Sequence, residues 1–282
     1  MKSDSSCFPC FFEQAHSSVC YAVEDEGKRW EVLKGLGPVL PQLSAEFSPA
    51  HNSSLILHQV NELLGVADPY AEAKRQSNEQ CLAMVPALMN RIKVSEDRLE
   101  AAVRLSVVGN VIDLGIKHQA DLEATIDHAL GDGYARFDFE PFKAKLAGAK
   151  RLLYVTDNAG EIVFDRILME GLKAHGKMVI AAVRGGPILN DATMADAQQV
   201  GLDKVAKVID TGCNYVGAPR EFASDMFKKV LESADMVIAK GQGNYETLDD
   251  LGDRAFFILK AKCGYVARTL GVQNGDLVLA QG

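Results

Sequence analysis

Short apolar runs alternate with helical stretches in the second half of this chain, and this alternation restricts the fold more than any other feature. The runs cover residues 152–155, 178–183, 205–209, 236–239 and 256–259, and helical stretches separate the first four. Apolar runs of this length are typical of buried strands. Strands that alternate with helices form parallel sheets with right-handed crossovers. The pattern therefore predicts an α/β fold, with a mainly parallel β-sheet flanked by helices.

The first half of the chain has a different periodicity. Up to about residue 130, apolar residues recur at steps of three and four, which is typical of amphipathic helices. Ser95 is placed to cap the last of them, which we expect to cover residues 99–116. The helical pattern breaks between Gly131 and Pro141. We therefore predict two domains, a helical domain over residues 1–140 and an α/β domain over residues 141–282.

The composition of the chain limits which kinds of molecule the protein can bind and where it can be located. The 282 residues carry a net charge of −8, which argues against non-specific nucleic-acid binding through phosphate neutralisation. No apolar run is long enough to span a bilayer, and the first residues lack the apolar core of a signal peptide. Six cysteines are too sparse for a disulfide framework in a chain of this length. We expect a cytoplasmic protein with reduced thiols, with no nucleic-acid or membrane partner, that binds a small molecule.

Polar or glycine-rich segments follow four of the predicted strands, over residues 157–161, 184–191, 210–212 and 240–244. The carboxyl ends of parallel strands face the ligand crevice, so these segments should converge there. Asp157 and Asn158 come directly after a buried strand, and we expect them at the centre of an active site.

The side chains of these segments suit a hard cation. Asp157, Asn158 and Asp191 supply oxygen ligands with two formal charges, which suits Mg²⁺ or Mn²⁺ holding several waters. No histidine lies in these segments, which argues against a His-rich zinc hydrolase. The dinucleotide-binding and P-loop fingerprints are also absent. The residue types favour phosphoryl transfer assisted by a divalent cation.

Two cationic residues stand directly before glycines in these segments. Lys240 precedes Gly241 and Arg184 precedes Gly185, and such pairs can hold phosphate oxygens through a charge and exposed amides. Alone, the lysine segment would be an ordinary strand-to-helix turn. Beside the acidic segments, we interpret both pairs as phosphate-binding, and we include Asn190 in the same substrate site.

Two further features leave alternatives open. Asn110 and Asp113 lie three residues apart on one face of an otherwise apolar helix, where they either brace a loop or belong to a site. Cys7 and Cys10 have the spacing of a zinc knuckle or a redox pair, but no second C-x-x-C accompanies them. A packing role for these two thiols is the simpler interpretation.

Taken together, these segments resemble a known family. Residues 156–161, 184–193, 239–246 and 259–263, together with Cys7-x-x-Cys10, Asp68-Pro69-Tyr70 and residues 109–113, resemble the domain of unknown function 89 (DUF89) family. Its members are described as metal-dependent damage-control phosphatases. The resemblance covers nearly the whole chain, and the chain looks most like the stand-alone prokaryotic branch.

The resemblance implies a helical N-terminal domain packed on a Rossmann-like α/β domain, with one divalent cation (Mg²⁺, Mn²⁺, Co²⁺ or Ni²⁺) in the cleft. Related branches act on small phosphorylated metabolites, including sugar phosphates and phosphopantetheine compounds. Carried over by motif, the resemblance implies that the metal ligands are Asp157, Asn158 and Asp191. It implies that Lys240 holds the substrate phosphate, and that Asn110 and Asp113 line the cleft from the helical side.

We therefore predict a phosphomonoester hydrolase for a small phosphorylated metabolite. Asp157 or Glu161 orients or deprotonates the attacking water, while Lys240 and the cation offset the charge of the phosphoryl oxygens. Covalent attack by Asp157 is the alternative route. Two other classes stay open, an S-adenosylmethionine-dependent methyltransferase and a non-catalytic module that binds a phosphorylated ligand. The sequence does not indicate an oligomeric state.

Overall fold

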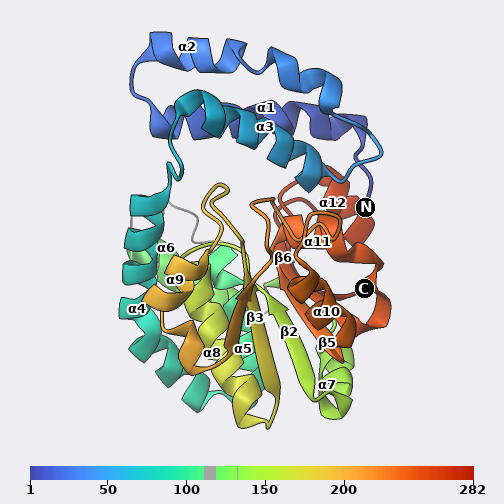
Figure 1. Ribbon diagram of the computed structural model, residues 1–282. Coiled ribbons are helices and arrows are strands. Elements are labelled where there is room, and N and C mark those ends of the chain that lie inside the picture. Colours follow the sequence, from blue (N-terminus) through green and yellow to red (C-terminus); the bar gives the residue numbers. More distant parts are fainter. Residues whose placement is uncertain (111–118, 132) are drawn as a thin grey trace.

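A seven-stranded sheet flanked by helices forms the body of the computed structural model, which describes residues 1–110, 119–131 and 133–282 (Figure 1). The strand order within these residues is β1-β7-β6-β5-β2-β3-β4, and only β6 and β7 pair in antiparallel fashion. The predicted α/β fold with a mainly parallel sheet is therefore confirmed. The strands are β1 (Tyr134–Phe137), β2 (Arg151–Val155), β3 (Met178–Val183), β4 (Lys207–Asp210), β5 (Met236–Lys240), β6 (Ala255–Lys260) and β7 (Leu277–Gln281).

The winding of the chain reverses between β2 and β5. From β2 the chain continues outward to β3 and β4, and it then returns to β5 on the other side of β2 and continues to β6. In open parallel sheets the ligand crevice lies at this reversal, outside the carboxyl ends of the strands. Because Val155 is paired with Ala239, the segments that follow β2 and β5 leave the sheet side by side. This topology puts Asp157 next to Gly241.

Side chains alternate between two apolar cores along each central strand, as the period of a β-strand requires. On β2, Tyr154 lies in one core and Leu153 and Val155 lie in the other. The first core is covered by α4 (Ala71–Val94), α5 (Arg98–Ser106), α6 (Gln119–Leu130), α7 (Phe139–Gly148), α8 (Glu161–Ala174) and α9 (Met194–Gln199). The second is covered by α10 (Asp225–Ser233), α11 (Gln242–Leu248) and α12 (Gly264–Leu270).

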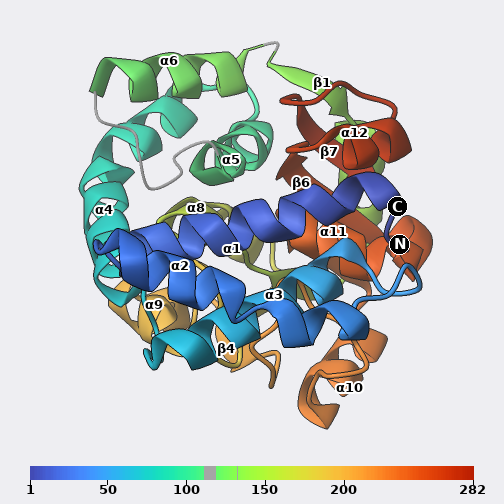
Figure 2. The ribbon, with the colours of Figure 1, turned by 90° about the horizontal axis from the view of Figure 1, so that it is seen from above.

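Three N-terminal helices form a separate layer with a core of its own, which we call the helical cap: α1 (Phe8–Ala22), α2 (Glu26–Lys34) and α3 (Pro49–Leu64). Figures 1 and 2 show the cap lying across one end of the α/β body. It is anchored to the segment after β4, since Ser54 Oγ accepts a hydrogen bond of 2.9 Å from the Val216 amide. The cap therefore covers the end of the sheet at which the polar segments follow the strands.

Local details differ from expectation at the two ends of α5. The helix begins after Asp97, whose Oδ1 accepts bonds from the Leu99 and Glu100 amides, so Asp97 rather than Ser95 is the N-cap. The Ser95 hydroxyl instead donates to the Arg91 carbonyl at the end of α4. The helix ends at Ser106, earlier than expected. Short 3₁₀ turns occur at Ser5–Cys7, Gly37–Gln42, Val108–Asn110, Leu202–Lys204 and Asp249–Arg254.

The predicted domain boundary at residue 140 stays a prediction. Strand β1 precedes that boundary, yet it pairs with β7 at the edge of the sheet. Helices α4 and α5 also precede it, and both pack against α8 of the α/β body. Within the described part of the chain, no helix has both the length and the apolarity that crossing a membrane requires.

Candidate active site

Two loops at the carboxyl edge of the sheet are fastened together by backbone hydrogen bonds. The loop after β2 donates from the Ala159 amide to the Asn190 carbonyl, at 2.9 Å, and accepts at the Asp157 carbonyl from the Ala192 amide, at 2.7 Å. Asn158 and Asp191 form an isolated antiparallel bridge between the loops. This pairing brings together the three predicted metal ligands, Asp157, Asn158 and Asp191.

Arg184 supports these carboxylates from inside the protein. Its guanidinium is fully buried, with Nε 2.6 Å from Asp191 Oδ2 and Nη2 3.4 Å from Asp157 Oδ1. The third contact joins Nη1 to Asn244 Oδ1 at 3.2 Å. Arg184 was predicted to bind phosphate, but its three donor nitrogens face protein oxygens. The geometry assigns it the positioning of the two aspartates.

Burial and the repulsion between Asp157 and Asp191 disfavour the ionised form of the two carboxyl groups. The pKa of Asp191 is raised to about 6. Burial raises it most, the nearby Arg184 lowers it, and the charge of Asp157 raises it further. A cation placed between the two carboxylates would relieve this repulsion, and the all-oxygen donor set of Asp157, Asn158 and Asp191 suits a hard divalent ion. Within the described ranges, no three or more His, Cys, Asp or Glu side chains lie where they could hold a metal. The predicted set consists of the carboxylates of Asp157 and Asp191 and the side-chain amide oxygen of Asn158, and these donors fit such an ion.

Gly241 permits the close approach of β5 to the aspartates. Its φ is +79°, and a Cβ at this position would lie 2.0 Å from Asp157 Oδ2. A larger residue would therefore displace the carboxylate. The Gly241 amide donates to the Ile258 carbonyl, and the Gly185 amide donates to the Cys213 carbonyl. Both glycines were predicted to offer amides to phosphate, but these two N–H groups already have protein acceptors.

Lys240 lies in a closed ionic cluster beneath the site. Its Nζ is 2.5 Å from Glu161 Oε1, 2.6 Å from Asp165 Oδ1 and 2.6 Å from the Ser106 carbonyl, and the Lys240, Glu161 and Asp165 side chains are fully buried. An ammonium has three donors, so all are used. The structure therefore corrects the predicted placement of Lys240 and Glu161, which face each other and not a substrate. Tyr154 completes the cluster by donating to Asp165 Oδ1 at 2.7 Å.

The cluster contains two carboxyl groups, those of Glu161 and Asp165, but only one ammonium group, that of Lys240. The two carboxylates raise the pKa of Lys240, while burial raises the pKa of Glu161 to about 8 and also raises that of Asp165. Among the residues that the structure describes, none provides a hydrogen-bond partner for the buried oxygens Glu161 Oε2 and Asp165 Oδ2. Two buried carboxyl groups around one ammonium favour retention of one proton by the carboxyl pair.

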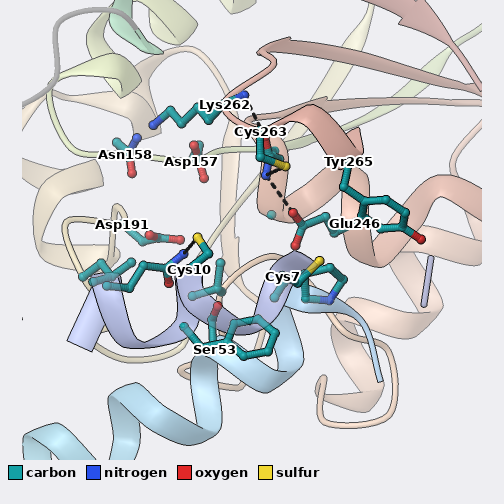
Figure 3. A pocket seen from close by; sticks show the side chains of 18 of the residues that line it. Cys7, Cys10, Ser53, Asp157, Asn158, Asp191, Glu246, Lys262, Cys263 and Tyr265 are labelled. Atoms are coloured by element: carbon teal, nitrogen blue, oxygen red, sulfur yellow. Dashed lines mark hydrogen bonds between the residues drawn. The ribbon is translucent and has the colours of Figure 1, made fainter. Parts of the chain in front are cut away.

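A cavity of ≈ 270 Å³ lies between the helical cap and the loops of the sheet (Figure 3). Of the predicted site residues, Asp157, Asn158, Asn190 and Asp191 line it. Asn110 lies in the 3₁₀ turn after α5, and Asp113 lies outside the described residues. The remaining wall comes from the cap and from the segments after β5 and β6, and its principal side chains are Cys7, Cys10, Phe11, Gln14, Ser53, Gln242, Glu246, Lys262, Cys263 and Tyr265.

Lys262 is the principal residue that sequence reasoning missed. It is the second residue after β6, and Figure 3 shows its side chain extending toward Asn158 and Asp157. Lys262 is solvent-exposed, and no other basic side chain lines the described cavity. The signal that found the other segments, a polar residue just past a buried strand, applied equally to Lys262. No pattern in the sequence could have placed the cap residues in this wall.

Cys7 and Cys10 also face this cavity. Burial raises the pKa of both thiols, and Cys10 Sγ accepts a bond of 3.4 Å from Gln14 Nε2. Cys7 also belongs to the apolar core of the cap. A thiol with a raised pKa is a poor nucleophile at neutral pH, so the packing interpretation of these residues agrees with their surroundings.

The fold and the site define a class of α/β proteins that bind a small ligand where acidic loops leave a parallel sheet, under a helical cap. The chain belongs to the family defined by the damage-control phosphatase ARMT1-like domain, whose model matches residues 3–278. The predicted family is thereby confirmed.

Similar proteins cover the whole chain. A damage-control phosphatase of Pyrococcus horikoshii is 36% identical over 283 residues, which are 99% of this chain and 97% of the relative. A damage-control phosphatase of Archaeoglobus fulgidus is 34% identical over 285 residues, 99% of this chain and 98% of the relative. The crystal structure of a DUF89 family protein from Pyrococcus horikoshii superposes with a TM-score of 0.92 at 37% identity, covering 100% of this chain and 99% of that structure.

Proposed function

We propose that this chain is a metal-dependent phosphatase that hydrolyses small phosphorylated metabolites in the cavity beneath the helical cap. The observation that carries the proposal is the convergence of Asp157, Asn158 and Asp191 in one wall of a cavity, with Lys262 extending toward them. The related proteins that are named damage-control phosphatases support the same activity.

Asp157, Asn158 and Asp191 would hold one divalent cation, for which Mg²⁺, Mn²⁺, Co²⁺ and Ni²⁺ are the candidates. Such an ion supplies Lewis acidity, which offsets the charge of phosphoryl oxygens and makes water more acidic. Arg184 keeps both carboxylates in place through its contacts with Asp157 and Asp191. Because the guanidinium is buried, its charge holds the two carboxylates close together without occupying the cavity.

Lys262 takes the role that the sequence analysis gave to Lys240. Its ammonium reaches the cavity from the edge of β6 and would bind the phosphoryl oxygens as a point charge. Asp157 is the carboxylate that would orient the attacking water and accept its proton, because Glu161 is enclosed with Lys240. Water would then form a bond to phosphorus while the bond between phosphorus and the ester oxygen breaks. The proton taken up by Asp157 would pass to the leaving oxygen, so that an alcohol and inorganic phosphate are released.

The test is phosphate release from a panel of small phosphomonoesters. The protein is first treated with a chelator, and Mg²⁺, Mn²⁺, Co²⁺ or Ni²⁺ is then restored. We expect turnover with at least one cation, and a loss of about 10²- to 10³-fold in kcat/KM for Lys262→Met, as for removal of other groups that stabilise transition-state charge. Absence of turnover with every cation in folded protein would refute the proposal.

A further inference from the structure

The cavity has a second polar wall opposite the proposed metal ligands. This wall is contributed by α1, α3 and α11, and its polar side chains are those of Gln14, Ser53, Gln242 and Glu246. Two amides and a hydroxyl can accept or donate hydrogen bonds, but an ionised carboxylate only accepts. Glu246 is therefore the residue that gives this wall a chemical preference.

Glu246 is held firmly in this position. The residue is 5% exposed, and its Oε1 accepts a bond of 2.9 Å from Gln242 Nε2. The other end of the same amide, Gln242 Oε1, accepts a bond of 2.9 Å from the Lys262 backbone amide. The Ala50 backbone N–H, in the first turn of α3, also bonds the Glu246 carboxylate. One amide side chain thus links the carboxylate to the loop that carries the proposed phosphate-binding lysine.

The distribution of charge around the cavity is uneven. Among the described residues that line it, Asp157, Asp191 and Glu246 are acidic and Lys262 is the single basic one. Lys262 extends toward Asn158 and Asp157, away from Glu246 (Figure 3). The Met1 ammonium, which is not part of this lining, donates to the Glu246 backbone carbonyl at 2.8 Å. A second anionic group on the substrate would meet this carboxylate in a partly desolvated place, where repulsion is strong. A donor group, above all an ammonium, would be attracted there.

We propose that Glu246 is a specificity-determining residue, which selects phosphomonoesters whose far end carries a hydrogen-bond donor, best an ammonium, and rejects those with a second anion. This inference rests on the proposed phosphatase function. The cavity, ≈ 270 Å³, has room for a phosphate group and a short organic part that reaches from Lys262 to Glu246. Charge at the two ends would then also fix the direction in which the substrate enters.

The experiment uses alkyl monophosphates of equal chain length that end in an ammonium, a hydroxyl, a methyl or a carboxylate group. Values of kcat/KM are measured at pH 8, with the activating cation, for the wild type, for Glu246→Gln and for Glu232→Gln, an exposed glutamate on α10. For the wild type we expect the ammonium substrate to exceed the carboxylate substrate by at least about tenfold, the size of one charged contact. Glu246→Gln should reduce this ratio about tenfold, and Glu232→Gln should leave it unchanged.

The following results would overturn the inference. A wild-type preference for the carboxylate substrate would contradict the charge argument. A uniform fall of kcat/KM for all four substrates in Glu246→Gln, with an unchanged ratio, would show that Glu246 only braces Gln242 and α3. Turnover of none of the four compounds with any cation would remove the phosphatase function, and the inference with it, whereas turnover with an unchanged ratio would remove the inference alone.

Discussion

Replacement of Lys240 by methionine tests whether this residue organises the site or binds phosphate. The substitution removes three short bonds and leaves two carboxyl groups and the Ser106 carbonyl buried without a cation. Removal of one partner from a buried ion pair costs about 3–5 kcal/mol of folding free energy. We expect a loss of that size at pH 8 and a smaller loss at pH 5. The carboxyl groups of the folded variant stay protonated to a higher pH than in the unfolded chain, so stability falls as the pH rises.

The assay is urea unfolding of the wild type and of Lys240→Met at both pH values. The triple variant Lys240→Met/Glu161→Gln/Asp165→Asn provides the matched control, because it removes the charges together and should recover most of the lost stability. Lys262→Met, which changes an exposed side chain, should alter stability by no more than about 0.5 kcal/mol. A Lys240→Met protein as stable as the wild type, with weakened binding of inorganic phosphate, would refute this reasoning.

Three further predictions concern groups around the cavity. Burial raises the pKa of Glu246 from 4.5 to about 7, so the wild type should lose roughly 3 kcal/mol of stability as the pH rises between these values, and Glu246→Gln should flatten that part of the pH profile of unfolding. Gly241→Ala should abolish phosphate release, because its Cβ would lie 2.0 Å from Asp157 Oδ2; wild-type kinetics would contradict this. Asn78→Ala should lower the unfolding free energy by about 1–3 kcal/mol in a urea titration, since Asn78 Oδ1 binds the Gly160 amide at the start of α8; an unchanged midpoint would disprove it.

The centre of the sheet was predictable because each central strand is a nearly pure apolar run that ends in polar residues. The edge strand β1, by contrast, has a short and only partly buried sequence, Tyr134–Phe137, that carries little signal of its own. Strand β7 is also an apolar run. Its antiparallel pairing with β6, however, depends on the turn that precedes it and on its register against β6. Local pattern does not fix either feature.

The placement of Lys240 could have been deduced from strand parity. Met236, Ile238 and Lys240 share one side of β5, and Met236 and Ile238 lie in the core that α8 covers. Glu161 and Asp165 are four residues apart and therefore lie on the same side of α8. The alternation along β5 and the spacing in α8 therefore favour a buried ion cluster, whereas our prediction of a phosphate site rested on the proximity of Lys240 to a glycine-rich turn.

The wall formed by the helical cap could not have been predicted in the same way. The amphipathic pattern of α1 and α3 shows that each helix buries one face, but it does not show which surface that face meets. Cap residues such as Ser53 reach the cavity only because α3 docks on the segment after β4. This docking depends on tertiary contacts, such as the bond from the Val216 amide to Ser54, which have no sequence signature.

The most direct test of the proposed site is the binding of Mn²⁺ to chelator-treated protein, followed by electron paramagnetic resonance. The wild type should bind one Mn²⁺ per chain in the cavity. Asp191→Ala should weaken this binding at least about 100-fold, since it removes one of two charged ligands. Asp203→Ala, at an exposed position in the 3₁₀ turn before β4, should bind like the wild type. Equal binding by the wild type and by Asp191→Ala would contradict the assignment of the metal to Asp157, Asn158 and Asp191.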